Sequence, residues 1–97
     1  MAYEAISAYN EAIRLDPGYV DAWTNKGGVL LFQKNYDDAI KAYNEAIRLD
    51  SNDSSSWMGK GGAFYLQGKY DDAMEAFDEA IKIDPRNAFA LQSKASV

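Results

Sequence analysis

The sequence predicts an all-α repeat protein made of stacked antiparallel helix pairs. The chain repeats itself with a 34-residue period, so that residues 36–39 (Tyr-Asp-Asp-Ala) return as residues 70–73. Apolar and small residues recur at helical spacing inside each period. Pro17 and Pro85 follow the predicted second helices, where a proline stops a helix from continuing. Together these observations favour a one-dimensional stack over a single central core.

The register of the repeat divides the 97 residues into unequal parts. Aligning residues 20–53 with 54–87 gives about 14 identical positions in 34, so these two segments are complete repeats. Residues 1–19 supply only a second helix, and residues 88–97 only the start of a first helix. We therefore expect one domain, 1–97, with six helices. The frame looks like a fragment of a longer array or a circularly shifted three-unit array.

The first helix of each repeat is predicted at about 21–33 and 55–67. In the earlier copy, Trp23, Gly27, Leu30 and Leu31 share one helical face. The loop 50–56 is polar, and its serines are expected to cap the helix that follows. Ser51 replaces the proline of the other units, which predicts a looser joint at this point.

The second helix of each repeat is predicted at about 37–49 and 71–83. Its apolar stripe in the earlier copy consists of Ala39, Ile40, Tyr43, Ala46 and Ile47. Acidic pairs open both helices, where the helix dipole favours negative charge. Gly68 suits the left-handed turn before the later copy, and we expect Asn35 to serve similarly in the earlier one.

Small residues recur in the same register as the helices. Gly27, Gly61 and Ala95 are spaced by 34 residues. Glycine inside a helix costs roughly 1 kcal/mol relative to alanine, so its recurrence indicates that the space is needed. We expect close approach of helix backbones at these positions, with Tyr43 and Phe77 filling the gaps between them.

Composition excludes several classes of function. The net charge of −5 argues against nucleic acid and against an acidic membrane surface. The absence of cysteine and histidine removes the commonest metal ligands and catalytic groups, so we expect no enzyme, no metal and no cofactor. The N-terminal residues lack a signal-peptide pattern and no window is long and apolar enough to span a membrane, which favours a cytoplasmic protein. The acidic loop at 50–55 lacks the glycine and closing glutamate of a calcium loop.

Several segments resemble the tetratricopeptide repeat. They are Trp-x-x-Lys-Gly at 23–27, Tyr-Asp-Asp-Ala-Ile at 36–40, Tyr-x-x-Ala at 43–46, and a closing Leu-Asp before proline. The resemblance covers essentially the whole chain. It implies helix pairs in a right-handed superhelix, a scaffolding role without chemistry, and a concave groove that binds a peptide or a partner helix. Lys26, Lys60 and Lys94 depart from the family, which often has leucine at this position.

The resemblance also implies which residues line the groove. They are Thr24, Asn25, Gly28, Leu31, Phe32, Met58, Gly62, Tyr65, Leu66, Phe89, Gln92 and Ser93. The alternative is that Leu31, Phe32, Tyr65 and Leu66 are stacking core. Relatives that clamp an acidic peptide terminus use Lys, Arg and Asn on the groove wall, and only Asn25 fits here, so such a clamp is not expected.

Two further interpretations remain open from the sequence. The three lysines form either a basic ladder for an acidic partner or stems that lie along the surface with solvated heads. The half repeats at each end could also pair head to tail between two copies of the chain, giving a self-assembling scaffold. The residues expected at those ends are Ile6, Tyr9, Ile13, Phe89, Leu91 and Ala95. The partner is accordingly a protein or peptide, with another copy of this chain as the alternative.

Overall fold

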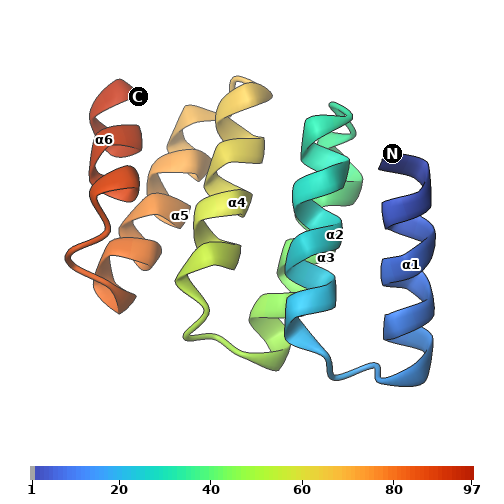
Figure 1. Ribbon diagram of the computed structural model, residues 1–97. Helices are drawn as coiled ribbons and strands as arrows, with labels where there is room; N and C mark the ends of the chain where they lie inside the picture. The colour runs from blue at the N-terminus through green and yellow to red at the C-terminus, as the bar shows by residue number, and fades with distance from the viewer. Residues whose placement is uncertain (1) are drawn as a thin grey trace.

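Six α-helices make up the part of the chain that the structure describes, residues 2–97 of a computed structural model (Figure 1). The helices are α1 (Ala2–Leu15), α2 (Val20–Phe32), α3 (Tyr36–Leu49), α4 (Ser54–Leu66), α5 (Tyr70–Ile83) and α6 (Ala88–Ser96). No strand occurs within residues 2–97. The all-α prediction is confirmed, and the bounds of the four central helices lie within one residue of those expected. Met1, which belongs to the predicted half repeat 1–19, lies outside the described residues.

The helices form an elongated stack. Each helix packs against the next one along the chain, and α2 also packs against α4. In Figure 1 the stack runs from α1 on the right to α6 on the left, with α3 lying behind α2. The molecule measures 37 × 25 × 18 Å. This is a helix-pair solenoid, in which neighbouring repeats bury one another's apolar faces.

A left-handed residue turns the chain from each first helix into the second. Gly68 has φ 79°, as predicted, and glycine adopts this conformation without steric cost. The prediction for Asn35 was wrong: the left-handed residue is Lys34, with φ 65°, whereas Asn35 has φ −91°. Lys34 is the residue 34 positions before Gly68, so the repeat register, and not the preference of asparagine, decides which residue takes the strained position.

The side chain that caps α4 is an aspartate. Oδ1 of Asp53 accepts a hydrogen bond from the backbone N–H of Ser55 at 3.1 Å. The prediction that serines of this loop cap the helix was therefore wrong. Asn87, 34 residues later, caps α6 by accepting a hydrogen bond from the N–H of Ala90 at 3.0 Å. Helices α1 and α5 end just before Pro17 and Pro85, as expected.

The core of the stack is a row of alanines and two aromatic rings. Ala39, Ala46, Ala73 and Ala80 are completely buried, so α3 and α5 approach their neighbours closely. Tyr43 is buried on α3 and Phe77 at the equivalent place on α5. The buried cluster around Tyr43 also includes Leu30, Ala39 and Ala42, with Ile6, Trp23 and Leu31 packed against it.

The glycines of the first helices make room for these rings. A Cβ at Gly27 would lie 2.8 Å from Tyr43 Cε1, and a Cβ at Gly59 would lie 2.2 Å from Tyr43 Cζ. Tyr43 is thus wedged between α2 and α4. Gly61 makes room for Phe77 in the same way, since a Cβ at this position would lie 2.5 Å from Cε1 of the ring. The sequence led us to expect that these glycines let two helix backbones approach each other. Instead they let the backbones of α2 and α4 approach the rings of Tyr43 and Phe77.

The indole of each tryptophan donates a hydrogen bond to the loop that precedes its repeat. Nε1 of Trp23 donates to the carbonyl of Pro17 at 3.1 Å, and Nε1 of Trp57 donates to the carbonyl of Ser51 at 3.1 Å. Since a backbone carbonyl is the acceptor in both, the serine at position 51 preserves this bond.

Candidate functional site

Helix α4 presents two different surfaces to its surroundings. Trp57, Lys60 and Phe64 lie on one side of the helix and line one hollow with residues of α5. Met58, Gly62 and the end of the helix lie on the other side and line a hollow shared with α6. The helical spacing of these residues separates the two sets by nearly half a turn around the helix axis. The two surfaces can therefore be considered separately.

The second of these surfaces is an apolar hollow between α4 and α6. Its volume is about 300 Å³. It is lined by Met58, Gly62, Tyr65, Leu66, Phe77, Phe89, Ser93 and Ser96. An adjoining hollow of about 450 Å³ reaches toward α2 and toward the first turns of α4 and α6. It is lined by Leu31, Ser55, Met58, Gly59, Gly62, Asn87 and Phe89. Because Met58, Gly62 and Phe89 line both hollows, the two form one continuous groove, which we call the α4–α6 groove.

Large apolar side chains stand exposed on the first helices of the repeats. The exposed fraction is 55% for Leu66 and 70% for Phe89, which line the α4–α6 groove, and 85% for Phe32 at the end of α2. Phe32 and Leu66 are therefore not stacking core, although the sequence left that open. Leu31 does belong to the stack: it packs against the buried cluster around Tyr43, and its Cδ2 lies 3.9 Å from where a Cβ of Gly62 would stand. Tyr65 is partly exposed and packs edge to face on Tyr70, with 5.5 Å between ring centroids.

Four of the predicted groove residues lie elsewhere. Thr24, Asn25, Gly28 and Phe32 line a separate hollow of about 510 Å³ between α1 and α2. Its remaining lining residues are Ala5, Tyr9 and Val29. The predicted set is thus divided between two hollows. Gln92 is exposed on α6 and lines neither of them.

The hydroxyl of Thr24 takes part in a contact between repeats. Its Oγ1 lies 3.0 Å from Asp53 Oδ2 and 2.9 Å from Ser56 Oγ, and Ser56 also donates to Asp53 Oδ2 at 2.8 Å. Ser56 is completely buried. This polar cluster joins α2 to the start of α4, which gives Thr24 a structural partner within the protein.

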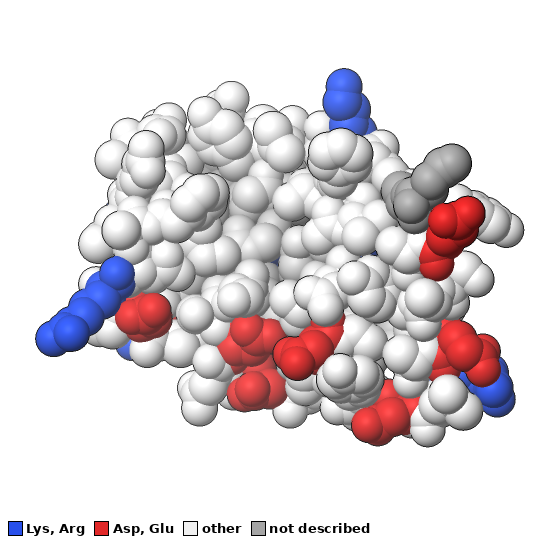
Figure 2. Space-filling view, in the orientation of Figure 1, with Lys and Arg blue, Asp and Glu red and all other residues white. Residues whose placement is uncertain are grey.

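The side chains that line the α4–α6 groove carry no charge. Figure 2 shows this face as a broad uncharged surface with acidic groups gathered along its lower edge. That edge is formed by the loops that precede α2, α4 and α6 (Figure 1). The loops carry Asp16, Asp50, Asp53 and Asp84, and their single basic residue is Arg86.

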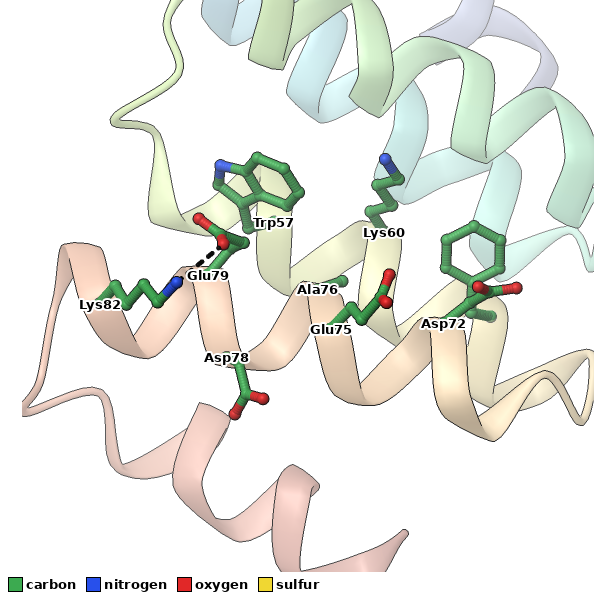
Figure 3. A pocket seen from close by; sticks show the side chains of 9 residues that line it. Trp57, Lys60, Asp72, Glu75, Ala76, Asp78, Glu79 and Lys82 are labelled. Atoms are coloured by element: carbon green, nitrogen blue, oxygen red, sulfur yellow. Dashed lines mark hydrogen bonds and ion pairs between the residues drawn. The ribbon is translucent and has the colours of Figure 1, made fainter.

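The opposite surface of α4 has a hollow with mixed walls, about 570 Å³ in volume (Figure 3). The ammonium of Lys60 lies 5.2 Å from the ring centroid of Trp57 and 6.0 Å from that of Phe64. Carboxylates of α5 line the same hollow, and one of them, Glu79, pairs with Lys82 at 3.3 Å. Aromatic and charged groups of this hollow are thus engaged largely with one another.

The contacts of the three lysines bear on their two interpretations. The ammonium of Lys26 lies 5.5 Å from the ring centroid of Trp23, an arrangement equivalent to that of Lys60 and Trp57. Lys94 pairs with Asp78 at 2.8 Å. Cations held over rings within the same helix contribute about 0.5–1 kcal/mol each at exposed sites. The lysines therefore have intramolecular partners, which disfavours a ladder kept for an acidic ligand.

Sequence reasoning missed several residues that line the groove. Phe77 reaches it from α5, Gly59 forms part of its floor, and Ser55 and Asn87 stand where it approaches the loops. The resemblance implies a groove lined chiefly by first helices, so it gave no reason to include Phe77 of a second helix. Gly59 could have been found, since it lies three residues before Gly62, about one helical turn away along α4.

The residues predicted for the two ends have mixed exposure. Ile6, Tyr9 and Ile13 of α1 are half-buried, while Leu91 and Ala95 of α6 are exposed, as is Phe89. Tyr3 and Leu15, which the sequence did not single out, are exposed large apolar residues of α1.

Other kinds of site are not indicated by the described residues. Within residues 2–97, no helix combines the length and the apolarity needed to cross a membrane. In the same range, no group of three or more His, Cys, Asp or Glu side chains is placed to hold a metal ion.

Comparison with known proteins agrees with this geometry. No curated protein matches the sequence. Among solved structures, the TPR domain of Arabidopsis OM64 has a TM-score of 0.94 at 21% identity, covering 98% of this chain and 78% of that one. The first TPR of Spaghetti (RPAP3), bound to the HSP90 peptide SRMEEVD, has a TM-score of 0.95 at 21% identity, covering 98% and 75%. The second TPR domain of human RPAP3, in complex with the HSP70 peptide SGPTIEEVD, has a TM-score of 0.93 at 25% identity, covering 98% and 79%.

The sequence profile described as "Tetratricopeptide repeat" matches residues 4–54 and 29–88. Together the two matches extend over most of the chain. This chain belongs to the tetratricopeptide repeat family.

Proposed function

We propose that this protein binds a segment of another protein in the α4–α6 groove and on the adjoining surface of α2. The observation that carries the proposal is the exposure of Leu66 and Phe89 in an uncharged hollow that Gly62 also lines. Exposed apolar surface of this kind, gathered on one face, is typical of interaction sites. The proposal assigns the protein a binding and scaffolding role and no reaction.

The chemistry of the groove favours an apolar ligand. Burying one large apolar side chain contributes roughly 1.5–3 kcal/mol, and Met58 and Phe89 offer adaptable and aromatic contacts. Two structural neighbours were solved with peptides that end in Glu-Glu-Val-Asp. The lining of the α4–α6 groove has no Lys or Arg with which to pair such a tail. We therefore expect acidic tails of this kind to bind poorly.

A peptide display screen followed by fluorescence titration tests the proposal. Gly62→Leu fills the groove, and leucine is a good helix former, so the variant is expected to fold. It should weaken binding of the selected peptides by roughly tenfold or more, the effect of losing one buried side chain. Phe89→Ser should have a similar effect without disturbing the core, because this ring is 70% exposed.

The matched control is Lys60→Leu, which places the same side chain on the opposite surface of α4. Circular dichroism on all three variants establishes that they fold. Selected peptides that bind Gly62→Leu and Phe89→Ser as tightly as the unchanged protein would show that the groove is not the site.

A second candidate function is self-association, with α6 of one copy packed on α1 of another as a first helix packs on a second helix. The hollow of about 510 Å³ between α1 and α2 favours it, since this space lies beside Tyr9 and is unfilled. In that arrangement Ala95 would stand opposite Tyr9, where the interior repeat has Gly27 opposite Tyr43. A Cβ at Gly27 would be 2.8 Å from the ring, so Tyr9 would have to move into the hollow.

Sedimentation over a wide range of concentration tests self-association. The average mass should rise above the 10.8 kDa of one chain as concentration increases. Ala95→Gly should strengthen the association by relieving the contact with Tyr9, and Leu91→Asp should weaken it. A mass of one chain at every concentration would eliminate this candidate and leave the peptide-binding proposal standing.

A further inference from the structure

The acidic edge of the binding face has a regular construction. Asp16, Asp50 and Asp84 are spaced by 34 residues, and in each the Oδ1 atom accepts a hydrogen bond from the backbone N–H two residues later. The three distances are 3.2, 3.1 and 3.2 Å. These turns explain why aspartate stands at each position. Each turn uses one oxygen of the carboxylate as an acceptor, and the carboxylate keeps its negative charge.

Two more carboxylates stand at the same edge. Asp21 lies in the first turn of α2, and Asp53 caps α4. Within residues 2–97, none of these five aspartates forms an ion pair. Arg86 is the one basic residue in the loops there. Arg14, Arg48 and Lys82, in the last turns of α1, α3 and α5, are each balanced by a paired glutamate. Counting five carboxylates against one guanidinium then gives this edge a charge of about −4 at neutral pH.

The edge and the groove are adjacent. Ser55 and Asn87 line the groove, and they are separated from Asp53 and Asp84 by only two and three positions along the chain. A side chain of a ligand lying in the groove would therefore stand within the distance of roughly 8–10 Å over which charges interact in physiological salt. The groove itself holds no charge that would oppose the field of the edge.

Resting on the proposed binding function, we infer that the partner is a segment with apolar side chains that enter the α4–α6 groove and with Lys or Arg residues along the flank that faces the acidic edge. The argument is charge complementarity combined with an uncharged floor. A basic flank gains attraction from the carboxylates, while an acidic flank is repelled. This inference separates the ligand of this protein from peptides that end in several carboxylates.

A pair of synthetic peptides provides the probe. Each is about 12 residues long, since an extended chain covers roughly 3.3 Å per residue and the molecule is 37 Å long. Both carry the apolar residues of a peptide selected for groove binding. One has Lys and Arg at the flanking positions, and the other has Glu at the same positions.

The protein variant is the triple substitution Asp16→Asn, Asp50→Asn and Asp84→Asn. The asparagine oxygen can still accept the backbone hydrogen bond of each turn, so the substitution removes charge and keeps the local structure. The matched control, Asp38→Asn with Asp71→Asn and Asp72→Asn, removes the same number of charges at the starts of α3 and α5, away from the edge.

The unchanged protein should bind the basic peptide on the order of tenfold or more tightly than the acidic one, since each exposed charge pair contributes about two- to threefold. The edge triple variant should lose most of this preference and most of its salt dependence, and the control triple variant should keep both. Equal binding of the two peptides, or equal effects of the two triple variants, would overturn the inference about charge. Either result is compatible with groove binding, whereas failure of both peptides to respond to Gly62→Leu would refute the proposed function itself.

Discussion

Glycines 59 and 62 lie on the same helix, one turn apart, and replacing each with alanine should change stability in opposite directions. Gly59 faces the ring of Tyr43, where a Cβ would lie 2.2 Å from Cζ, 2.4 Å from Cε1 and 2.6 Å from Oη. Gly62 faces the groove, and the nearest atom to its Cβ would be Leu31 Cδ2 at 3.9 Å. The first substitution creates a clash and the second an ordinary contact.

The magnitudes follow from two opposing effects. Alanine is better than glycine inside a helix by about 1 kcal/mol. At Gly62 nothing opposes this gain, so the free energy of unfolding should rise by about 1 kcal/mol. At Gly59 the ring must move, but a Cβ at Gly27 would already lie 2.8 Å from its other side, so it has little room. Overpacking of this kind costs about 1–3 kcal/mol, which leaves a net loss of up to about 2 kcal/mol.

Urea and thermal unfolding of the two variants measure the difference. For a domain of this size, 1 kcal/mol corresponds to about 4–8 °C in Tm. Gly62→Ala should raise Tm by about that amount, and Gly59→Ala should lower it with an unchanged urea dependence. If both substitutions stabilised the protein equally, Tyr43 would not be wedged against Gly59 and the packing described above would be wrong.

Three further predictions concern the contacts between repeats. Asp53→Ala should lower the free energy of unfolding by about 1–2 kcal/mol through the lost cap, with a further loss because Thr24 and Ser56 lose the carboxylate oxygen that both hydroxyls share as acceptor, whereas Asp53→Asn should lose less in urea unfolding. Burial raises the pKa of Tyr43 from 10.0 to about 12, so the folded protein favours the neutral phenol. The contribution of the neutral phenol to the free energy of unfolding is complete below pH 10 and is lost as the pH rises through 12. Unfolding measured from pH 9 to 12 should show a loss of up to about 2–3 kcal/mol that Tyr43→Phe lacks. Trp57→Phe removes the bond to the carbonyl of Ser51 and should lower stability by about 1 kcal/mol, and no change in Tm would count against the role given to this indole.

Much of the fold could be predicted because each structural feature recurs in the sequence at the 34-residue period. The helix bounds, the left-handed Gly68 and the stops before Pro17 and Pro85 all follow from local chemistry. The prediction failed at Asn35, where residue preference pointed to one position and the register to its neighbour, Lys34. It also failed at the cap of α4, since any of several polar residues in that loop could cap a helix and only the geometry selects Asp53.

The site was harder to predict than the fold. Helical spacing says which residues share a face, but it does not say how far the neighbouring helix covers that face. Thr24 shares a face with groove residues, yet a contact with Asp53, 29 residues away, gives it a structural role. Phe32 and Leu31 are adjacent in sequence, and only the packing of α2 against α4 makes one exposed and the other part of the stack.

The central claim is that ligands bind on the face formed by α2, α4 and α6, and the location of a bound peptide tests it most directly. Backbone amide spectra recorded during titration with the basic peptide would show which residues respond. We predict that the largest shifts fall on Leu31, Met58, Gly62, Leu66 and Phe89, the residues of the groove and its rim. Shifts concentrated instead around Trp57, Lys60 and Glu75, on the opposite surface, would contradict it.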